Sequence, residues 1–106
     1  MRFLMTTRPS ENARNDEEMF AEMGRFVEET TAAGILLATG GLEPGGVHID
    51  AKGGEITFTD GPFTEAKEAV AGFALVEVSS REEAIEIARR FYRIIGEGEG
   101  VIQQVF

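Results

Sequence analysis

Residues 72–84, GFALVEVSSREEA, decide the fold, because a strand pattern in this stretch runs directly into a helix start. Residues 72–78 are apolar on both faces of a strand except at Glu77, which is typical of a strand inside a sheet. Ser79 and Ser80 each have a glutamate three residues on, the spacing of a capping box. Apolar residues then recur at helical spacing, namely Ala84, Ile87, Ala88, Phe91 and Ile95. The stretch therefore predicts a buried strand followed by an amphipathic helix.

A similar pattern of strand, helix and strand occupies the first part of the chain. Residues 2–7 alternate in the manner of a short strand. Asn15 or Asp16 can then cap a helix, for which Gly34 is a suitable terminator. Residues 35–42 have the pattern of the next strand. This part of the chain predicts a first helix with a strand on either side of it.

Two short β-type runs and a terminal strand complete the order. Residues 47–51 and 55–59 flank the tripeptide Lys-Gly-Gly at 52–54, and paired glycines accept the positive φ values of a tight hairpin turn. Residues 98–100, Gly-Glu-Gly, have the composition of a flexible connector before a last strand at residues 101–106. The predicted order is strand, helix, strand, hairpin, strand, helix, strand.

This order predicts an α+β fold of the split-βαβ, ferredoxin-like type with an inserted β-hairpin, in a single domain over residues 1–106. Two right-handed βαβ units place both helices on one face of the sheet. The opposite face is then bare, although the strand at residues 72–78 is apolar on both sides. Since a large exposed apolar face seeks burial, a second copy of the chain is the economical partner. We therefore expect a homodimer that packs sheet against sheet.

The size and the net charge of the chain exclude several classes of partner and of catalysis. A chain of 106 residues holds one hydrophobic core, and 19 acidic against 10 basic residues give a net charge of -9. This charge repels phosphate backbones and anionic lipids, so neither nucleic acid nor a membrane is an expected partner. No apolar run approaches the ~20 residues that span a bilayer, and we expect a cytoplasmic protein. Because the sequence has no cysteine, disulfides and thiolate catalysis are excluded.

Residues 60–63, Asp-Gly-Pro-Phe, carry a family resemblance. Together with residues 65–68, Glu-Ala-Lys-Glu, this signature resembles that of the DGPF-domain proteins within the YCII-related family. The likeness covers essentially the whole chain and includes the segments 2–5, 33–34, 40–44 and 82–84. It implies a dimeric α+β barrel, which is a ferredoxin-like fold in which two sheets pack together. It also implies membership of a family whose biochemical role is mostly unassigned.

One chemical feature of the family does not transfer to this chain. Some YCII-like proteins have a His and Asp pair suggested as an acid–base dyad, with the histidine on the first helix about three turns before its terminal glycine. Counted back from Gly34, this region holds Glu22, Met23 and Gly24. Because the histidine is missing, the resemblance implies no dyad here, and only the signature that begins at Asp60 carries over.

Asp60 is the candidate catalytic residue, and it has two interpretations. Its side chain can accept backbone N–H groups and stabilise a turn without any chemistry. Alternatively, a carboxylate at the mouth of the sheet can orient or deprotonate a small ligand. Pro62 and Phe63 would then shape the rim of the ligand site. Arg8, at the end of the first strand, and Lys67 are candidates to bind an anionic group beside Asp60, although both also fit a solvated surface.

His48 is the only histidine, which excludes metal sites that need two imidazoles, and no metal or other cofactor is expected. It shares a strand face with Asp50, so the two side chains could form an acid–base couple. Their place in a glycine-flanked hairpin favours a solvent-facing position instead.

Two functions stay open from the sequence. The first is a small dimeric protein with a shallow pocket near Asp60 that binds a small polar metabolite. General acid–base chemistry by Asp60 is the reaction that the residues favour in this case. The second is a non-catalytic protein-interaction or regulatory module that uses the acidic surface and the dimeric sheet. The sequence does not decide between an enzyme and a binding protein.

Overall fold

The computed structural model describes residues 1–8, 10–61 and 70–106. The order of its elements agrees with the order predicted from the sequence. These elements are β1 (Arg2–Arg8), α1 (Glu17–Ala32), β2 (Leu36–Gly41), β3 (Val47–Lys52), β4 (Glu55–Asp60), β5 (Gly72–Glu77), α2 (Arg81–Ile95) and β6 (Glu99–Val105).

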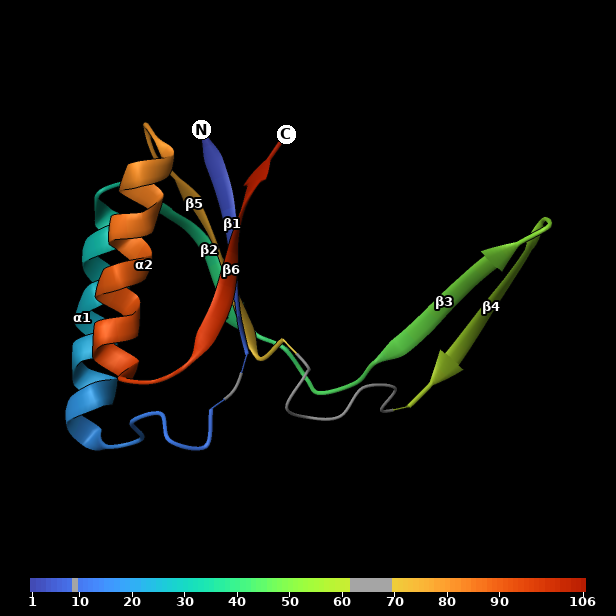
Figure 1. The fold of residues 1–106 in the computed structure, drawn as a ribbon, viewed down its shortest axis with the longest axis horizontal. Helices are drawn as coiled ribbons and strands as arrows, with labels where there is room; N and C mark the ends of the chain where they lie inside the picture. Colours follow the sequence, from blue (N-terminus) through green and yellow to red (C-terminus); the bar gives the residue numbers. More distant parts are fainter. Residues whose placement is uncertain (9, 62–69) are drawn as a thin grey trace.

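Four of the strands form one sheet in the order β2-β5-β1-β6, and all neighbours in it are antiparallel. The two strands that flank each helix are separated by a strand of the other unit, as in a split βαβ fold. Both helices lie on the same side of this sheet, to its left in Figure 1. The predicted ferredoxin-like α+β class is therefore confirmed.

Capping side chains explain where the helices begin. Asp16 caps α1 by accepting a hydrogen bond of 2.7 Å from the backbone N–H of Met19, so it is Asp16 rather than Asn15 that fills this position. Ser80 caps α2 by accepting from the backbone N–H of Glu83 at 3.1 Å, while the Glu83 carboxylate accepts from the backbone N–H of Ser79. In the described part of the chain, neither helix has the length and apolarity to cross a membrane.

The core lies between the sheet and the helices. Phe3 on β1 and Val76 on β5 are paired across the sheet and are fully buried. They form one cluster with Phe26 of α1 and with Ala84 and Ile87 of α2. The alternation predicted for β1 is therefore correct, because its odd-numbered residues face the helices.

The last strand begins earlier than predicted. Residues 98–100 were expected to form a connector, but Glu99 and Gly100 already pair with β1. A Cβ atom at Gly100 would collide with the backbone oxygen of Thr6 and with the hydroxyl of Tyr92. The glycine is therefore needed for close packing inside a strand, which composition alone does not distinguish from flexibility.

The other face of the sheet carries apolar residues that no helix of the described chain covers (Figure 1). We call it the open face. Leu4 of β1 pairs with Leu75 of β5, and Thr6 pairs with Phe73 and with Val101 of β6. Since directly paired residues lie on the same side of a sheet, these side chains form one surface opposite the helices.

Strands β3 and β4 form a separate two-stranded sheet that we call the arm, residues Val47–Asp60. It projects away from the body formed by the other elements, to the right in Figure 1, and the molecule is 46 Å long along this direction. Gly53 and Gly54 have φ values of 59° and 85°, as a tight hairpin turn requires. The predicted hairpin is confirmed, but it does not join the main sheet.

Candidate functional site

A cavity of about 450 Å³ lies between the sheet and the two helices, at the end where β1 and β2 finish and β5 begins. This volume is within the range of sites that bind small molecules. The cavity is lined by strands β1, β2 and β5, by both helices and by the loops near them. Most side chains of the interior are apolar, among them Met5, Met23, Phe26, Phe91 and Ile95.

Small residues of β2 and β5 lie beside this space and let the two strands pack closely. A Cβ atom at Gly40 would lie 3.1 Å from the ring of Phe73, and one at Gly72 would lie 3.2 Å from the backbone oxygen of Gly40. Larger residues would therefore push β2 and β5 apart. Ala71 and Ala74 also line the cavity and add only methyl groups to it.

Polar side chains gather among the described residues at the mouth. The Arg8 guanidinium lies 3.6 Å from the Glu99 carboxylate, and the Ser10 hydroxyl donates a hydrogen bond of 2.8 Å to Glu97. Hydrogen bonds from Ser10 and then from Asn12 lower the pKa of Glu97 below its ordinary value. Glu97 is therefore ionised at neutral pH and is a weak base.

These contacts define what the cavity can do chemically. Arg8 and Glu97 are the charged side chains in the described lining. Arginine keeps its proton at any physiological pH, and the lowered pKa of Glu97 makes it a poor proton acceptor. The described lining is therefore suited to recognition. Its interior can hold an apolar ring, and its mouth can bind an anionic or hydroxyl substituent.

The residues predicted for the site are placed as follows. Arg8 lines the cavity. Asp60 is the last residue of β4, is exposed, and is not among the described lining residues. Within the described chain, no hydrogen bond or ion pair engages its carboxylate. Pro62, Phe63 and Lys67 lie outside the described residues, so their roles stay predictions.

His48 and Asp50 lie on the same face of β3, as the alternation predicted. Both are exposed on the arm. The arm projects away from the main sheet in Figure 1. No cluster of three or more potential metal ligands is found among residues 1–8, 10–61 and 70–106.

Sequence reasoning missed Ser10, Glu97 and Met23. Ser10 and Glu97 are 87 residues apart, and only the closing of the fold brings their side chains together. Met23 occupies the region of the first helix where some YCII-like proteins have a histidine, and here it lines the cavity. The one signal available was this helical position, since it showed where the family places a side chain toward a site. In this chain the position carries an apolar group.

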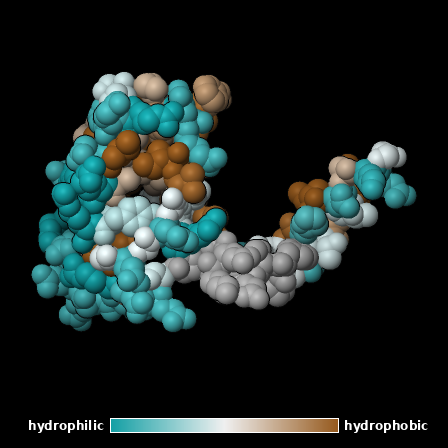
Figure 2. All heavy atoms as spheres, viewed as in Figure 1, coloured by the Kyte–Doolittle hydropathy of each residue, from teal (hydrophilic) through white to brown (hydrophobic). Residues whose placement is uncertain are grey.

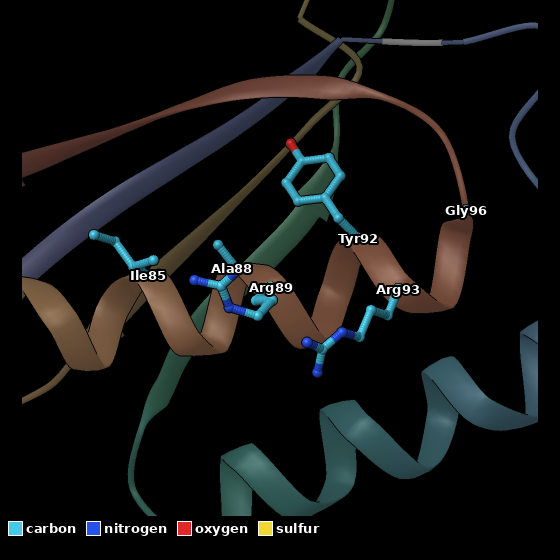
Figure 3. A pocket seen from close by; sticks show the side chains of 6 residues that line it. All are labelled: Ile85, Ala88, Arg89, Tyr92, Arg93 and Gly96. Atoms are coloured by element: carbon cyan, nitrogen blue, oxygen red, sulfur yellow. The ribbon is translucent and has the colours of Figure 1, made fainter.

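A second hollow lies on the outer surface of α2 (Figure 3). The ring of Tyr92 extends from it toward the sheet, and its hydroxyl lies 3.1 Å from the hydroxyl of Thr7. Arg89 at its edge is bound to Glu86 at 3.2 Å. Tyr92 and Arg89 of this shallow surface are thus engaged in structural contacts, whereas the cavity beneath the sheet encloses space.

Comparison with known proteins identifies relatives of both the sequence and the fold. An uncharacterised protein of Rhizobium meliloti (strain 1021) is 32% identical over 76 residues, which are 70% of this chain. The match spans 61% of that relative's length. The solved structure of 5-chloro-2-hydroxyhydroquinone dehydrochlorinase (TftG) from Burkholderia phenoliruptrix AC1100, in complex with 2,5-dihydroxybenzoquinone, superposes with a TM-score of 0.53. The match covers 100% of this chain and 94% of that chain at 14% identity, which supports a shared fold.

The family is shown by the extent of one match. The family model of the YCII-related domain matches residues 1–98, which is nearly the whole chain. This agrees with the resemblance carried by the signature at Asp60 and with the ferredoxin-like arrangement of the sheet. The chain belongs to the YCII-related family.

Proposed function

We propose that this protein binds a small ring-sized molecule with an anionic or hydroxyl substituent in the cavity beneath the sheet. The observation that carries the proposal is the cavity itself, which holds about 450 Å³ of space with an apolar interior and a polar mouth. Arg8 is among the residues that line that mouth, and its guanidinium lies 3.6 Å from the Glu99 carboxylate. The apolar lining changes the expected ligand from a small polar metabolite to a molecule with an apolar body and a polar substituent.

The dehydrochlorinase gives this ligand class limited support. It was solved with 2,5-dihydroxybenzoquinone, a ring of this size that carries oxygen substituents. At 14% identity the likeness concerns the fold, so the ligand class proposed here rests on the lining of the cavity in this chain.

If the protein is an enzyme, Asp60 is the proposed general acid or base, with Arg8 balancing its charge. Asp60 is the last residue of β4, and Ala71, which lines the cavity, follows eleven residues later in the sequence. A turnover screen with hydroxylated benzoquinones would test this role. Asp60→Asn should lose turnover while keeping ligand affinity, and equal turnover in the variant and the unaltered protein would contradict it.

Binding is tested by isothermal titration calorimetry with benzoates and hydroxylated benzoquinones as probes. Arg8→Gln should weaken binding of the anionic probes about 10-fold or more, because a hydrogen bond to a charged group is lost. Arg2→Gln is the matched control, since Arg2 lies at the other end of β1 and pairs with Glu77 at 3.2 Å. Ala74→Leu should abolish binding of all probes, because it fills the cavity. Unchanged affinity in Ala74→Leu would contradict the site.

We also propose that the protein is a homodimer through the open face. Leu4, Leu75 and Phe73 form an apolar surface there, and Val101 and Val105 beside them are 47% and 42% exposed. Sedimentation equilibrium should give a dimer at micromolar concentration, and Leu75→Glu should convert it to a monomer. A monomeric mass for the unaltered protein would contradict this arrangement.

A further inference from the structure

The arm has one apolar and one polar face. In its register Ile49 pairs with Phe58 and Ala51 pairs with Ile56, which places these side chains on one side. Val47 pairs with Asp60 on the same side, at the end of the arm nearest the body. The three pairs on the other side are polar throughout, namely His48 with Thr59, Asp50 with Thr57 and Lys52 with Glu55. A hairpin with one apolar and one polar face is suited to pack its apolar face on another surface while its polar face contacts water.

In this chain the apolar face of the arm meets water. Val47, Ile49, Ile56 and Phe58 are 55%, 60%, 61% and 66% exposed. A two-stranded hairpin is marginally stable by itself, and it normally gains stability by packing its apolar face on another element. Figure 2 shows hydrophobic residues along the arm, which stands clear of the body. The arm is therefore incomplete within one chain.

The direction of the arm indicates which surface covers its apolar face. The helices lie to one side of the main sheet, and the arm extends to the opposite side, which is the side that the open face looks toward (Figure 1). A second copy packed on the open face lies on that same side. Because a two-fold interface is reciprocal, each copy then brings its arm to the other.

The size of the open face supports the same conclusion. Four strands about 4.8 Å apart, with a rise of about 3.3 Å per residue, outline roughly 400 Å². A stable interface buries about 800 Å² on each partner, so the open face alone is small for a stable dimer. By the same measure, an arm with two strands of six residues outlines roughly 200 Å². Because each copy gives one arm and receives another, the two arms add roughly 400 Å² to the contact surface of each partner.

We propose that the arm is a docking element that packs its apolar face, centred on Ile49 and Phe58, against the body of a second copy of the chain. The inference rests on the sheet-to-sheet dimer proposed above and extends it, because it assigns to the dimer a surface that the sheet does not contain. The polar face with His48 and Asp50 stays in water.

The first test compares neighbouring residues on the two faces of β4. Phe58→Asp places a charge on the apolar face and should raise the dissociation constant of the dimer about 30-fold or more, as expected for a buried aromatic contact. Thr59→Asp adds the same charge at the next residue, which lies on the polar face. This variant should change the dissociation constant of the dimer less than about 3-fold. Sedimentation equilibrium measures both. Equal dissociation constants for the two variants would overturn the inference.

The second test leaves the apolar face intact. Lys52→Cys, in a chain without other cysteines, allows one nitroxide label near the tip of the arm. Mixed dimers of labelled and ¹⁵N-enriched copies should show broadened amide signals in the body of the enriched copy. A dimer without this broadening would overturn the docking of the arm.

Two results separate this inference from the dimer itself. If the unaltered protein is a monomer, the proposed dimer and the arm contact both fail. If it is a dimer whose arm amides exchange with deuterium as fast as those of monomeric Leu75→Glu, the arm inference alone fails. Protection of the arm that requires a different protein would also overturn it, and would identify the arm as a site for another partner.

Discussion

The body and the arm use the same strand pattern, yet they differ in whether the chain can bury it. Phe3 in β1 is fully buried against the helices, whereas Phe58 in β4 is 66% exposed. Both residues alternate with polar or oppositely facing neighbours in a run that predicts a strand. The comparison shows that alternation fixes which side chains share a face. It leaves undetermined what covers that face, because the cover comes from elements distant in the sequence.

The largest expected effect comes from the same substitution in the two regions. Phe3→Ala should lower the free energy of unfolding by about 3–5 kcal/mol, because it leaves a cavity in the core. Phe58→Ala should cost less than about 1 kcal/mol when both are measured in the monomeric Leu75→Glu background. Urea unfolding gives both values. A large cost for Phe58→Ala in the monomer would mean that the chain covers its own arm.

A smaller effect is expected from glycines. Gly100→Ala should destabilise the body by about 2–3 kcal/mol, since the added Cβ meets the Thr6 carbonyl oxygen and the Tyr92 hydroxyl. Gly53→Ala in the arm should cost about 1 kcal/mol, because the site is spacious but its φ is 59°. Thermal unfolding compares the two. If Gly100→Ala and Gly53→Ala lost similar amounts of stability, β6 would have to shift to make room for the added Cβ atom.

Loss of a helix cap should lower the stability of the protein by less than the Gly100 substitution does. Ser80→Ala removes the acceptor for the Glu83 backbone N–H and should cost about 1 kcal/mol, which is the usual value of such a cap. Ser80→Asn, which also caps helices, is the control and should restore most of the loss. A loss of the same size in Ser80→Asn would show that the cap is not the cause.

The smallest effect concerns acid sensitivity of the body. Hydrogen bonds from the Ser79 side chain and then from its backbone lower the pKa of Glu83 from its ordinary value of 4.5. Because the folded pKa is lowered, the stabilisation is present above about 4.5 and is lost as the pH falls through the folded value. Ser79→Ala should raise the pKa of Glu83 toward 4.5 in a carboxyl carbon NMR titration. No change in the titration would contradict this cause.

The sequence predicted the elements of the body because their signals are local. Ser80 and Glu83 mark a helix start within four residues, and Gly96, with φ of 83°, ends the same helix. The position of β6 was predicted less well. Gly100 looked like a connector, and its role in packing depends on Tyr92 and Thr6, which come from other elements.

The cavity could not be predicted in the same way. Its interior forms where Met23 of α1, Phe91 of α2 and Met5 of β1 come together. From the sequence alone, each of these residues is expected in the hydrophobic core. Arg8 was predicted because it ends a strand, where ligands often bind. The separate position of the arm was also hidden, since a hairpin pattern looks the same whether or not it joins the main sheet.

The most direct test of the proposed site uses the four methionines of the chain. Met5 and Met23 line the cavity, whereas Met1 and Met19 are not among its described lining residues. Titration of ¹³C-methyl-labelled protein with benzoate or 2,5-dihydroxybenzoquinone should therefore shift the methyl signals of Met5 and Met23 and leave those of Met1 and Met19 in place. Binding that leaves the signals of Met5 and Met23 unchanged would contradict the cavity as the ligand site.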